Sequence, residues 1–499
     1  MKRSLSAIFF LILLTGMLRF PGISQAEEAS QLSFTNIGVV DHRSAPMSYI
    51  VNPFYTPDWI GEANYGGNSY AAAVASGGDV NGDGYADVII GAPYYTNGEY
   101  HEGRAYAYYG SASGLPSSPN WTFETNLAGC QLGWNAASAG DVNDDGFDDV
   151  LVASEYCTTG TPGTDREGRV YLFLGSASGL SLTYDWMKSG GTNDESFGWS
   201  IASAGDVNND GHDDVIIGAP WADYPEGNEG RAYVFYGTDT GLPLTADWIA
   251  ESNAWWTGFG NWVDSAGDVN GDGYDDVIIG HPGWSSPEDA EGRAYVYLGS
   301  ATGLALTPAW YFENNHANSE LGGTVAGVGD VDGDGFSDIL VGARRYANPN
   351  PYEGIAYLFL GSSSGPSLTP DWSREGNQSW AQYSWSLDGG DVNKDGYDDV
   401  IVGAPWYTDT VPVEGAVFLY FGSADGLLSG PVFTKGSGQE EAKLGWAAGF
   451  AGDVNGDGVN DIIVGARDYD GGQDNEGRAT VYYGIVDAKA AIFLPIVIR

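Results

Sequence analysis

Short runs of acidic and amide side chains are the residues of this chain best suited to chemistry. The first run, residues 79–87, carries side-chain oxygens at its positions 1, 3, 5 and 9 and a glycine at position 6. Calcium takes six to eight oxygen ligands, and glycine permits the sharp turn that wraps a loop around the ion. The run therefore predicts a calcium loop, in which the residue at position 7 offers its backbone carbonyl.

The pattern occurs seven times, and successive starts are 62, 65, 62, 62, 61 and 62 residues apart. A single run also fits an acidic turn that only solvates a hairpin, but seven runs in register favour metal binding. The predicted ligands at positions 1, 3, 5, 7 and 9 are Asp79, Asn81, Asp83, Tyr85, Asp87; Asp141, Asn143, Asp145, Phe147, Asp149; Asp206, Asn208, Asp210, His212, Asp214; Asp268, Asn270, Asp272, Tyr274, Asp276; Asp330, Asp332, Asp334, Phe336, Asp338; Asp391, Asn393, Asp395, Tyr397, Asp399; and Asp453, Asn455, Asp457, Val459, Asp461.

The charge of the chain supports the same interpretation. Its 499 residues include 67 acidic and 20 basic side chains, which gives a formal net charge of −47. Nucleic acid and anionic membranes are therefore unfavourable partners. Carboxylates crowd within each predicted loop, where each close like-charge pair costs about 1–4 kcal/mol. Up to seven Ca²⁺ ions would relieve this repulsion and stabilise the folded state by mass action, which indicates a structural rather than a catalytic metal.

Composition divides the chain into four segments. Residues 1–26 combine a basic start, an apolar run and small residues, as in a secretory signal peptide. Residues 27–52 form an N-terminal extension, residues 53–484 carry the repeats, and residues 485–499 form a tail with an apolar end. Neither apolar run is long enough for a membrane span. We expect a secreted protein, extracellular or at the cell surface, in which Cys130 and Cys157 form a disulfide rather than two buried thiols.

The repeats predict the fold. In the third unit, residues 197–202, 214–217 and 232–236 and a segment around Trp248 have the pattern of four short strands joined by hairpins. Four short strands per unit are typical of an all-β β-propeller, here with seven blades. Residues 55–59 are similar to a fourth-strand segment, residues 368–372, whereas the last unit stops after its third strand. We therefore predict that an N-terminal strand completes the last blade and closes the ring.

Two further residue types recur once per unit. A large aromatic residue lies nineteen or twenty residues before each loop, where packing between blades is a better explanation than a row of ligand-stacking rings. A glutamate before a glycine also recurs, and we interpret it as structural rather than catalytic because every unit has one. The aromatic residues are Trp59, Trp121, Trp186, Trp248, Trp310, Trp372 and Phe433, and the glutamates are Glu102, Glu167, Glu229, Glu291, Glu353, Glu414 and Glu476.

The third unit also carries a family resemblance. Its Phe197-Gly198 pair, its acidic loop and its Gly218-Ala219-Pro220 run resemble the FG-GAP repeats of the integrin alpha-subunit propeller. The resemblance covers residues 53–484 and implies calcium in every loop on the lower face and ligand binding on the upper face. Several units depart from these motifs, with leucine before the glycine or arginine in place of the proline. Stalk domains and a membrane helix, which an integrin subunit carries, are absent, so we expect a free-standing propeller.

Three functions remain open at this stage. The first is a non-catalytic binding or adhesion module for an extracellular protein or glycan. The second is a calcium-stabilised lectin, since the chain is also similar in outline to propellers among fungal lectins. The third, an enzyme acting on polysaccharides, is disfavoured because the histidines form no recognisable catalytic cluster. These histidines are His42, His101, His212, His281 and His316. The sequence does not fix the oligomeric state.

Aromatic residues crowd the loops that follow the predicted second strands. Such rings suit a cation or the apolar face of a sugar, although packing within the loops explains them equally well. These residues are Tyr94, Tyr95, Tyr156, Trp221, Trp284, Tyr346, Trp406, Tyr407 and Tyr469.

Overall fold

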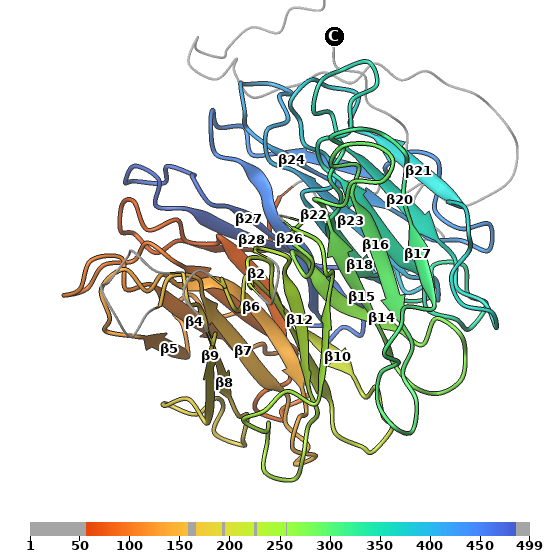
Figure 1. Ribbon diagram of the computed structural model, residues 1–499. Helices are drawn as coiled ribbons and strands as arrows, with labels where there is room; N and C mark the ends of the chain where they lie inside the picture. The colour runs from red at the N-terminus through yellow and green to blue at the C-terminus, as the bar shows by residue number, and fades with distance from the viewer. Residues whose placement is uncertain (1–55, 158–165, 192–194, 224–226, 256, 486–499) are drawn as a thin grey trace, which may run out of the picture. The chain divides into compact units, whose positions relative to one another are not determined.

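The computed structural model describes residues 56–157, 166–191, 195–223, 227–255 and 257–485. The predicted signal peptide, the N-terminal extension and most of the C-terminal tail lie outside these residues. The described chain folds into seven four-stranded antiparallel sheets arranged as the blades of a propeller (Figure 1). Within it, no helix has the length and apolar character needed to cross a membrane. The all-β fold and the seven blades are therefore confirmed.

The first four blades follow one another along the chain. Blade 1 consists of β2 (Ala73–Gly78), β3 (Asp87–Ala92), β4 (Arg104–Tyr108) and β5 (Trp121–Glu124). Blade 2 consists of β6 (Leu132–Gly140), β7 (Asp149–Ser154), β8 (Arg169–Phe173) and β9 (Trp186–Ser189). Blade 3 consists of β10 (Ser200–Gly205), β11 (Asp214–Ala219), β12 (Arg231–Phe235) and β13 (Trp248–Glu251). Blade 4 consists of β14 (Val263–Gly267), β15 (Asp276–His281), β16 (Arg293–Tyr297) and β17 (Trp310–Phe312).

The remaining blades keep this order except at the end. Blade 5 consists of β18 (Leu321–Gly327), β19 (Ile339–Ala343), β20 (Ile355–Phe359) and β21 (Trp372–Glu375). Blade 6 consists of β22 (Ser386–Gly390), β23 (Asp399–Ala404), β24 (Ala416–Tyr420) and β25 (Phe433–Gly436). Blade 7 consists of β26 (Leu444–Gly452), β27 (Asp461–Ala466), β28 (Arg478–Tyr482) and β1 (Trp59–Gly61).

The ring closes as predicted from the sequence. In the last sheet β1 lies beside β28, and Trp59 faces Val481 in antiparallel register. An ion pair between Arg478 and Glu62 reinforces this junction, and the backbone N–H of Tyr483 donates to the Asp58 carboxylate at 2.9 Å. The N-terminal strand therefore completes the last blade.

The strand boundaries in blade 3 differ from the prediction. The first strand begins at Ser200 rather than residue 197, because Ser196 and Gly198 have positive φ angles of 50° and 87°. The second strand continues through Gly218 and Ala219, where Gly218 pairs with Ala232 of the third strand. The second strand therefore includes Gly218 and Ala219 and ends before Pro220, which lies in a turn.

Packing between neighbouring blades forms the core. Every residue of the second strand β11 is buried, as expected for a strand covered on both faces. The recurring tryptophans lie in these interfaces, and their indole N–H groups donate to a carbonyl of the next blade. Trp248, for example, bonds to Ala305 at 3.0 Å and packs edge-on against Tyr297. Packing rather than ligand stacking is therefore confirmed for this position.

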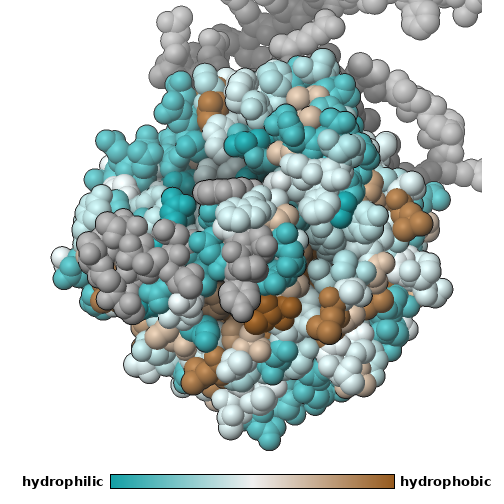
Figure 2. Space-filling view, in the orientation of Figure 1, coloured by the Kyte–Doolittle hydropathy of each residue, from teal (hydrophilic) through white to brown (hydrophobic). Residues whose placement is uncertain are grey.

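A buried disulfide and a mostly polar face complete the fold. Cys130 and Cys157 form the predicted disulfide, which links the segments on either side of the β6–β7 hairpin. The face seen in Figure 2 is mostly polar, and its hydrophobic residues form separate patches.

Candidate calcium loops

Each acidic run forms the connection between the first and second strands of its blade, on the side that we call the lower face. Loop 4, between β14 and β15, shows the shared geometry. Asp268 Oδ1 accepts hydrogen bonds from the N–H groups of Gly271 at 2.7 Å and Asp272 at 3.0 Å, and its Oδ2 accepts from Gly273 at 2.8 Å. Asn270 Oδ1 also accepts from Asp272, at 2.9 Å. Backbone N–H groups therefore hold the position-1 and position-3 oxygens on the inside of the turn.

The closing aspartate at position 9 is the most constrained member of each loop. Asp276 is fully buried, and its Oδ1 accepts from the Gly299 N–H at 2.8 Å while Oδ2 accepts from Val269 at 3.1 Å. Desolvation, with a further contribution from the charges of Asp272 and Asp268, raises the pKa of Asp276 to about 7. The same causes, with each loop's own aspartates, raise the pKa of Asp149 to about 8. A divalent cation would favour the ionised form of these buried carboxylates.

The donor set fits a hard cation. In loop 5, Asp330, Asp332 and Asp338 offer carboxylate oxygens that all lie within 4.8 Å of one another. In loops 3 and 6, the side-chain oxygens of Asn208 and Asn393 are buried and have no hydrogen-bond partner in the described structure. Carboxylate and amide oxygens are the ligands that calcium prefers. Among the described residues, the three carboxylates of loop 5 are therefore suited to hold a hard cation such as calcium.

Loop 6 departs most from this arrangement. The Asn393 amide nitrogen donates to the closing carboxylate of Asp399 at 3.2 Å, whereas the position-3 side chain of loop 4 accepts a backbone hydrogen bond. Asn393 is also buried, with 1% of its surface exposed. A ligand in this loop must compete with the hydrogen bond between Asn393 and Asp399.

Position 7 has a second role in packing adjacent loops together. Gly82, at position 4 of loop 1, has a φ of 68°, and a Cβ atom there would lie 2.7 Å from the Phe147 ring of loop 2. Position 4 carries a side chain at Asp144, Asn209 and Lys394, and the next loops have His212, Tyr274 and Val459 at position 7. The ring of loop 2 therefore requires glycine at position 4 of loop 1, whereas Asn209 coexists with Tyr274 and donates to the Gly273 carbonyl at 2.8 Å.

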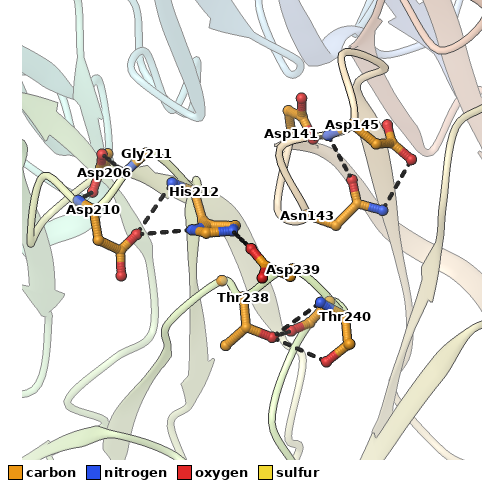
Figure 3. A network of polar contacts seen from close by, with 12 residues as sticks. Asp141, Asn143, Asp145, Asp206, Asp210, Gly211, His212, Thr238, Asp239 and Thr240 are labelled. Carbon is orange, nitrogen blue, oxygen red and sulfur yellow. Dashed lines mark hydrogen bonds and ion pairs between the residues drawn. The ribbon is translucent and has the colours of Figure 1, made fainter.

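Loop 3 is the one with histidine at position 7 (Figure 3). His212 Nδ1 lies 3.1 Å from Asp210 Oδ1, and Nε2 lies 3.0 Å from Asp239 Oδ1. Desolvation lowers the pKa of His212, but the hydrogen bonds to Asp210 and Asp239 outweigh it and raise the pKa overall. These residues line an open hollow of about 380 Å³, together with Thr238 and Thr240.

Sequence reasoning missed the role of position 8. Asp148 Oδ2 accepts from the backbone N–H of Asp79 at 2.6 Å, so the carboxylate of loop 2 fixes the first ligand residue of loop 1. Asp275 makes the same contact with Asp206, at 2.9 Å. Aspartate occupies position 8 in loops 2, 3, 4 and 6, and this recurrence is the signal that the sequence offered.

The recurring glutamates stabilise loops on the opposite, upper face, which carries the connections between second and third strands. Glu353 is fully buried and accepts from the Asn348 N–H at 2.6 Å. Glu414 accepts from Asp409 at 3.0 Å, and its pKa is lowered because backbone N–H groups outweigh desolvation. Their structural interpretation is confirmed at these positions.

The predicted upper-face aromatic residues differ in what they contact. Tyr95 and Tyr469 pack beneath the guanidinium groups of Arg104 and Arg478, whose Cζ atoms lie 3.9 and 3.7 Å from the ring centroids. Trp406 instead contacts other tryptophans near the start of the innermost strands, as described below. Packing therefore explains Tyr95 and Tyr469.

Seven four-stranded blades with an acidic loop beneath each define a β-propeller with repeated candidate metal loops. Seven segments match the FG-GAP repeat family, at residues 70–108, 133–173, 197–235, 259–297, 322–359, 383–420 and 444–482. They cover more than half of the chain, which therefore belongs to the FG-GAP repeat family.

Relatives in other organisms share part of this chain. Integrin alpha pat-2 of Caenorhabditis briggsae is 32% identical over 231 residues, which cover 43% of this chain and 18% of the integrin. Integrin alpha-6 of Gallus gallus is 30% identical, over 37% of this chain and 17% of the integrin. Phosphatidylinositol-glycan-specific phospholipase D of Bos taurus is 31% identical, over 38% of this chain and 24% of the enzyme. The matches thus span less than a quarter of each of these relatives.

Among solved structures, BBS1N in complex with ARL6DN aligns with 85% of this chain and 96% of its own. The TM-score is 0.47 and the sequence identity is 10%.

Proposed function

We propose that this protein is a secreted, calcium-stabilised binding module without catalysis of its own, and that its ligand binds the upper face. The observation that carries the proposal is a cluster of three tryptophans, Trp385, Trp406 and Trp446, with ring centroids 4.7–5.6 Å apart. Each is only partly buried. We call these residues the tryptophan cluster.

The division of roles between the two faces supports this proposal. The loops of the lower face repeat in every blade and are suited to hold up to seven calcium ions, as expected for a structural metal. Within the part of the chain that the structure describes, a cluster of three tryptophans occurs once, in blades 6 and 7. A single occurrence is expected of a ligand site, whereas a structural motif recurs in every blade. Integrin alpha subunits are among the relatives, which favours binding over catalysis.

We further propose that the protein is exported and that its chain has four segments. Residues 1–26 act as the signal peptide, residues 27–52 as an extension, and residues 53–484 as the propeller, followed by a tail. The Cys130–Cys157 disulfide is typical of an oxidising compartment. The relatives also include a phospholipase D, and an activity of this chain on a polysaccharide or a lipid is the competing hypothesis.

Binding of the calcium-loaded protein to a broad glycan array and to a panel of purified extracellular-matrix proteins tests the function. We expect binding to a coherent set of ligands, lost on chelation and weakened at least about tenfold by Trp406→Ala. Trp199→Ala is the control, because Trp199 lies outside the cluster, at the position in blade 3 that Trp385 occupies in blade 6, and contacts Trp134 at 5.5 Å. Ligands that bind Trp406→Ala as tightly as the unchanged protein would refute an upper-face site at this cluster. Turnover of a bound ligand would refute the absence of catalysis.

A further inference from the structure

Two departures from the repeat converge on the tryptophan cluster. After the second strands of blades 5 and 7, arginine replaces the proline of the Gly-Ala-Pro run, at Arg344 and Arg467. Blade 6, which lies between them, contributes Trp385 and Trp406. We infer that these residues form a binding site for an acidic carbohydrate, whose sugar ring stacks on indole and whose carboxylate pairs with guanidinium. This inference rests on the upper-face binding proposed above.

The aromatic part of the site is continuous. The rings of Trp385 and Trp446, from neighbouring blades, lie 4.7 Å apart between centroids, and Trp406 lies 4.8 Å from Trp385 and 5.6 Å from Trp446. Their interplanar angles of 48–76° present both ring faces and ring edges. Indole rings in this arrangement offer apolar area with little loss of side-chain entropy on binding.

The arginines approach this platform from two sides. Arg344 Cζ lies 5.0 Å from the Trp385 centroid, and Arg467 Cζ lies 4.0 Å from the Trp446 centroid. Stacking on indole fixes the plane of each guanidinium group, so its N–H groups are oriented before a ligand arrives. The guanidinium of Arg467 also lies 5.9 Å from the Tyr94 ring of blade 1.

Cations outnumber carboxylates in the ion pairs beside the cluster. Arg344 and Arg345 pair with Glu320, at 3.3 and 2.6 Å. Arg467 and Lys443 pair with Asp468, also at 3.3 and 2.6 Å. Four cations thus share two carboxylates in a protein whose formal net charge is −47. This local excess of positive charge selects an anionic ligand.

The geometry favours a sugar acid over an acidic peptide. In a uronic acid, the carboxylate is attached directly to the pyranose ring, so stacking and ion pairing occur within a few Å of each other. The guanidinium groups lie 4.0–5.0 Å from the rings that they cover, which matches this separation. An aspartate or glutamate side chain offers the carboxylate without a rigid apolar face, and it would leave the tryptophan cluster unused.

Calorimetry of the calcium-loaded, full-length protein with trigalacturonate and its methyl ester tests the inference. The ester keeps the ring and removes the charge. We expect the acid to bind about tenfold or more tightly than the ester, and to lose this advantage as salt is raised. Trp406→Ala should weaken both ligands, whereas Arg467→Met should weaken only the acid, and Trp199→Ala should change neither.

Arg345→Gln provides a second charge variant in case Arg467→Met does not fold, since 48% of the Arg345 side chain is exposed. It should reduce the preference for the acid about threefold, because a solvated charge beside the Glu320 ion pair attracts an anion only modestly. Equal affinity for acid and ester would overturn the acidic-sugar assignment while leaving upper-face binding intact. Binding of a glutamate oligomer without binding of either sugar would assign the site to an acidic peptide. Absence of binding by all three ligands would overturn this inference, whereas the proposed function would still be decided by the glycan array and the matrix-protein panel.

Discussion

Removal of calcium should make the stability of this protein depend steeply on pH. The cause is the set of buried closing aspartates, one at the start of each second strand. Desolvation first, and then neighbouring aspartates, raise the pKa of Asp87 to about 7 and that of Asp214 to about 8 without a bound cation. In the unfolded chain these groups return to about 3.9.

The direction of this pH dependence follows from proton linkage. Between about pH 4 and pH 8, the metal-free folded state binds more protons than the unfolded state, so its free energy of unfolding falls as pH rises. Stability is fully present below the unfolded pKa and is lost as pH rises through the folded pKa. For one loop, a rise from 3.8 to about 7 corresponds to about 4 kcal/mol. The summed contribution of a few such loops is as large as the free energy of unfolding of a typical domain, about 5–15 kcal/mol.

Thermal unfolding followed by circular dichroism, in chelator and in millimolar calcium, measures this effect. We expect the metal-free Tm to fall by about 10 °C or more between pH 5 and pH 8. The calcium-loaded Tm should change far less, because the ion keeps the aspartates ionised. The two curves should converge toward pH 4, where protonated aspartates hold calcium poorly. A metal-free Tm that is constant over this range and equal to the calcium-loaded value would refute both the buried-carboxylate argument and calcium binding in the loops.

Three other changes have defined expected outcomes. Trp248→Ala should cost about 3–5 kcal/mol in the free energy of unfolding, by chemical denaturation, because it empties the interface between blades 3 and 4; Trp248→Phe should cost less. Asp391→Asn in loop 6 should reduce calcium-dependent stabilisation less than Asp268→Asn in loop 4, because the hydrogen bond between Asn393 and Asp399 competes with the ion. Equal losses of stabilisation would contradict weaker calcium binding by loop 6. The Cys130→Ser variant should lose about 3–4 kcal/mol, since the disulfide closes a segment with a separation of 27 residues; a Cys157→Ser variant with unchanged stability would contradict this.

The sequence was sufficient for the architecture because each signal is local and repeated. The spacing of the acidic runs predicted the blades, and the similarity of residues 55–59 to residues 368–372 predicted the closure by β1. The inter-blade role of Trp248 followed from its period. The hydrogen bond from its indole N–H to the next blade could not be predicted, because the acceptor is a backbone carbonyl with no sequence signature.

The details of the sites depend on contacts between blades and could not be read from the period. The rotation of Asn393 toward Asp399 is a rotamer choice within a loop whose sequence differs from the others mainly at Lys394. The stacking of Arg344 on Trp385 joins residues of different repeats, and only the fold places them together. In both cases the sequence shows that a residue departs from the repeat, but not which contact follows from that change.

The closure of the ring by β1 also sets the order of assembly during synthesis. Trp59 can pair with Val481 only after nearly the whole propeller has been synthesised. Until then β1 has no strand to pair with, and the longest loop in the fold has yet to close. Earlier blades can pair their own strands as they appear, but the last junction is left to a late, non-local step. Slow passage through this stage would expose the nascent chain to edge-to-edge aggregation, so chaperone demand should be greatest just before the final blade is complete.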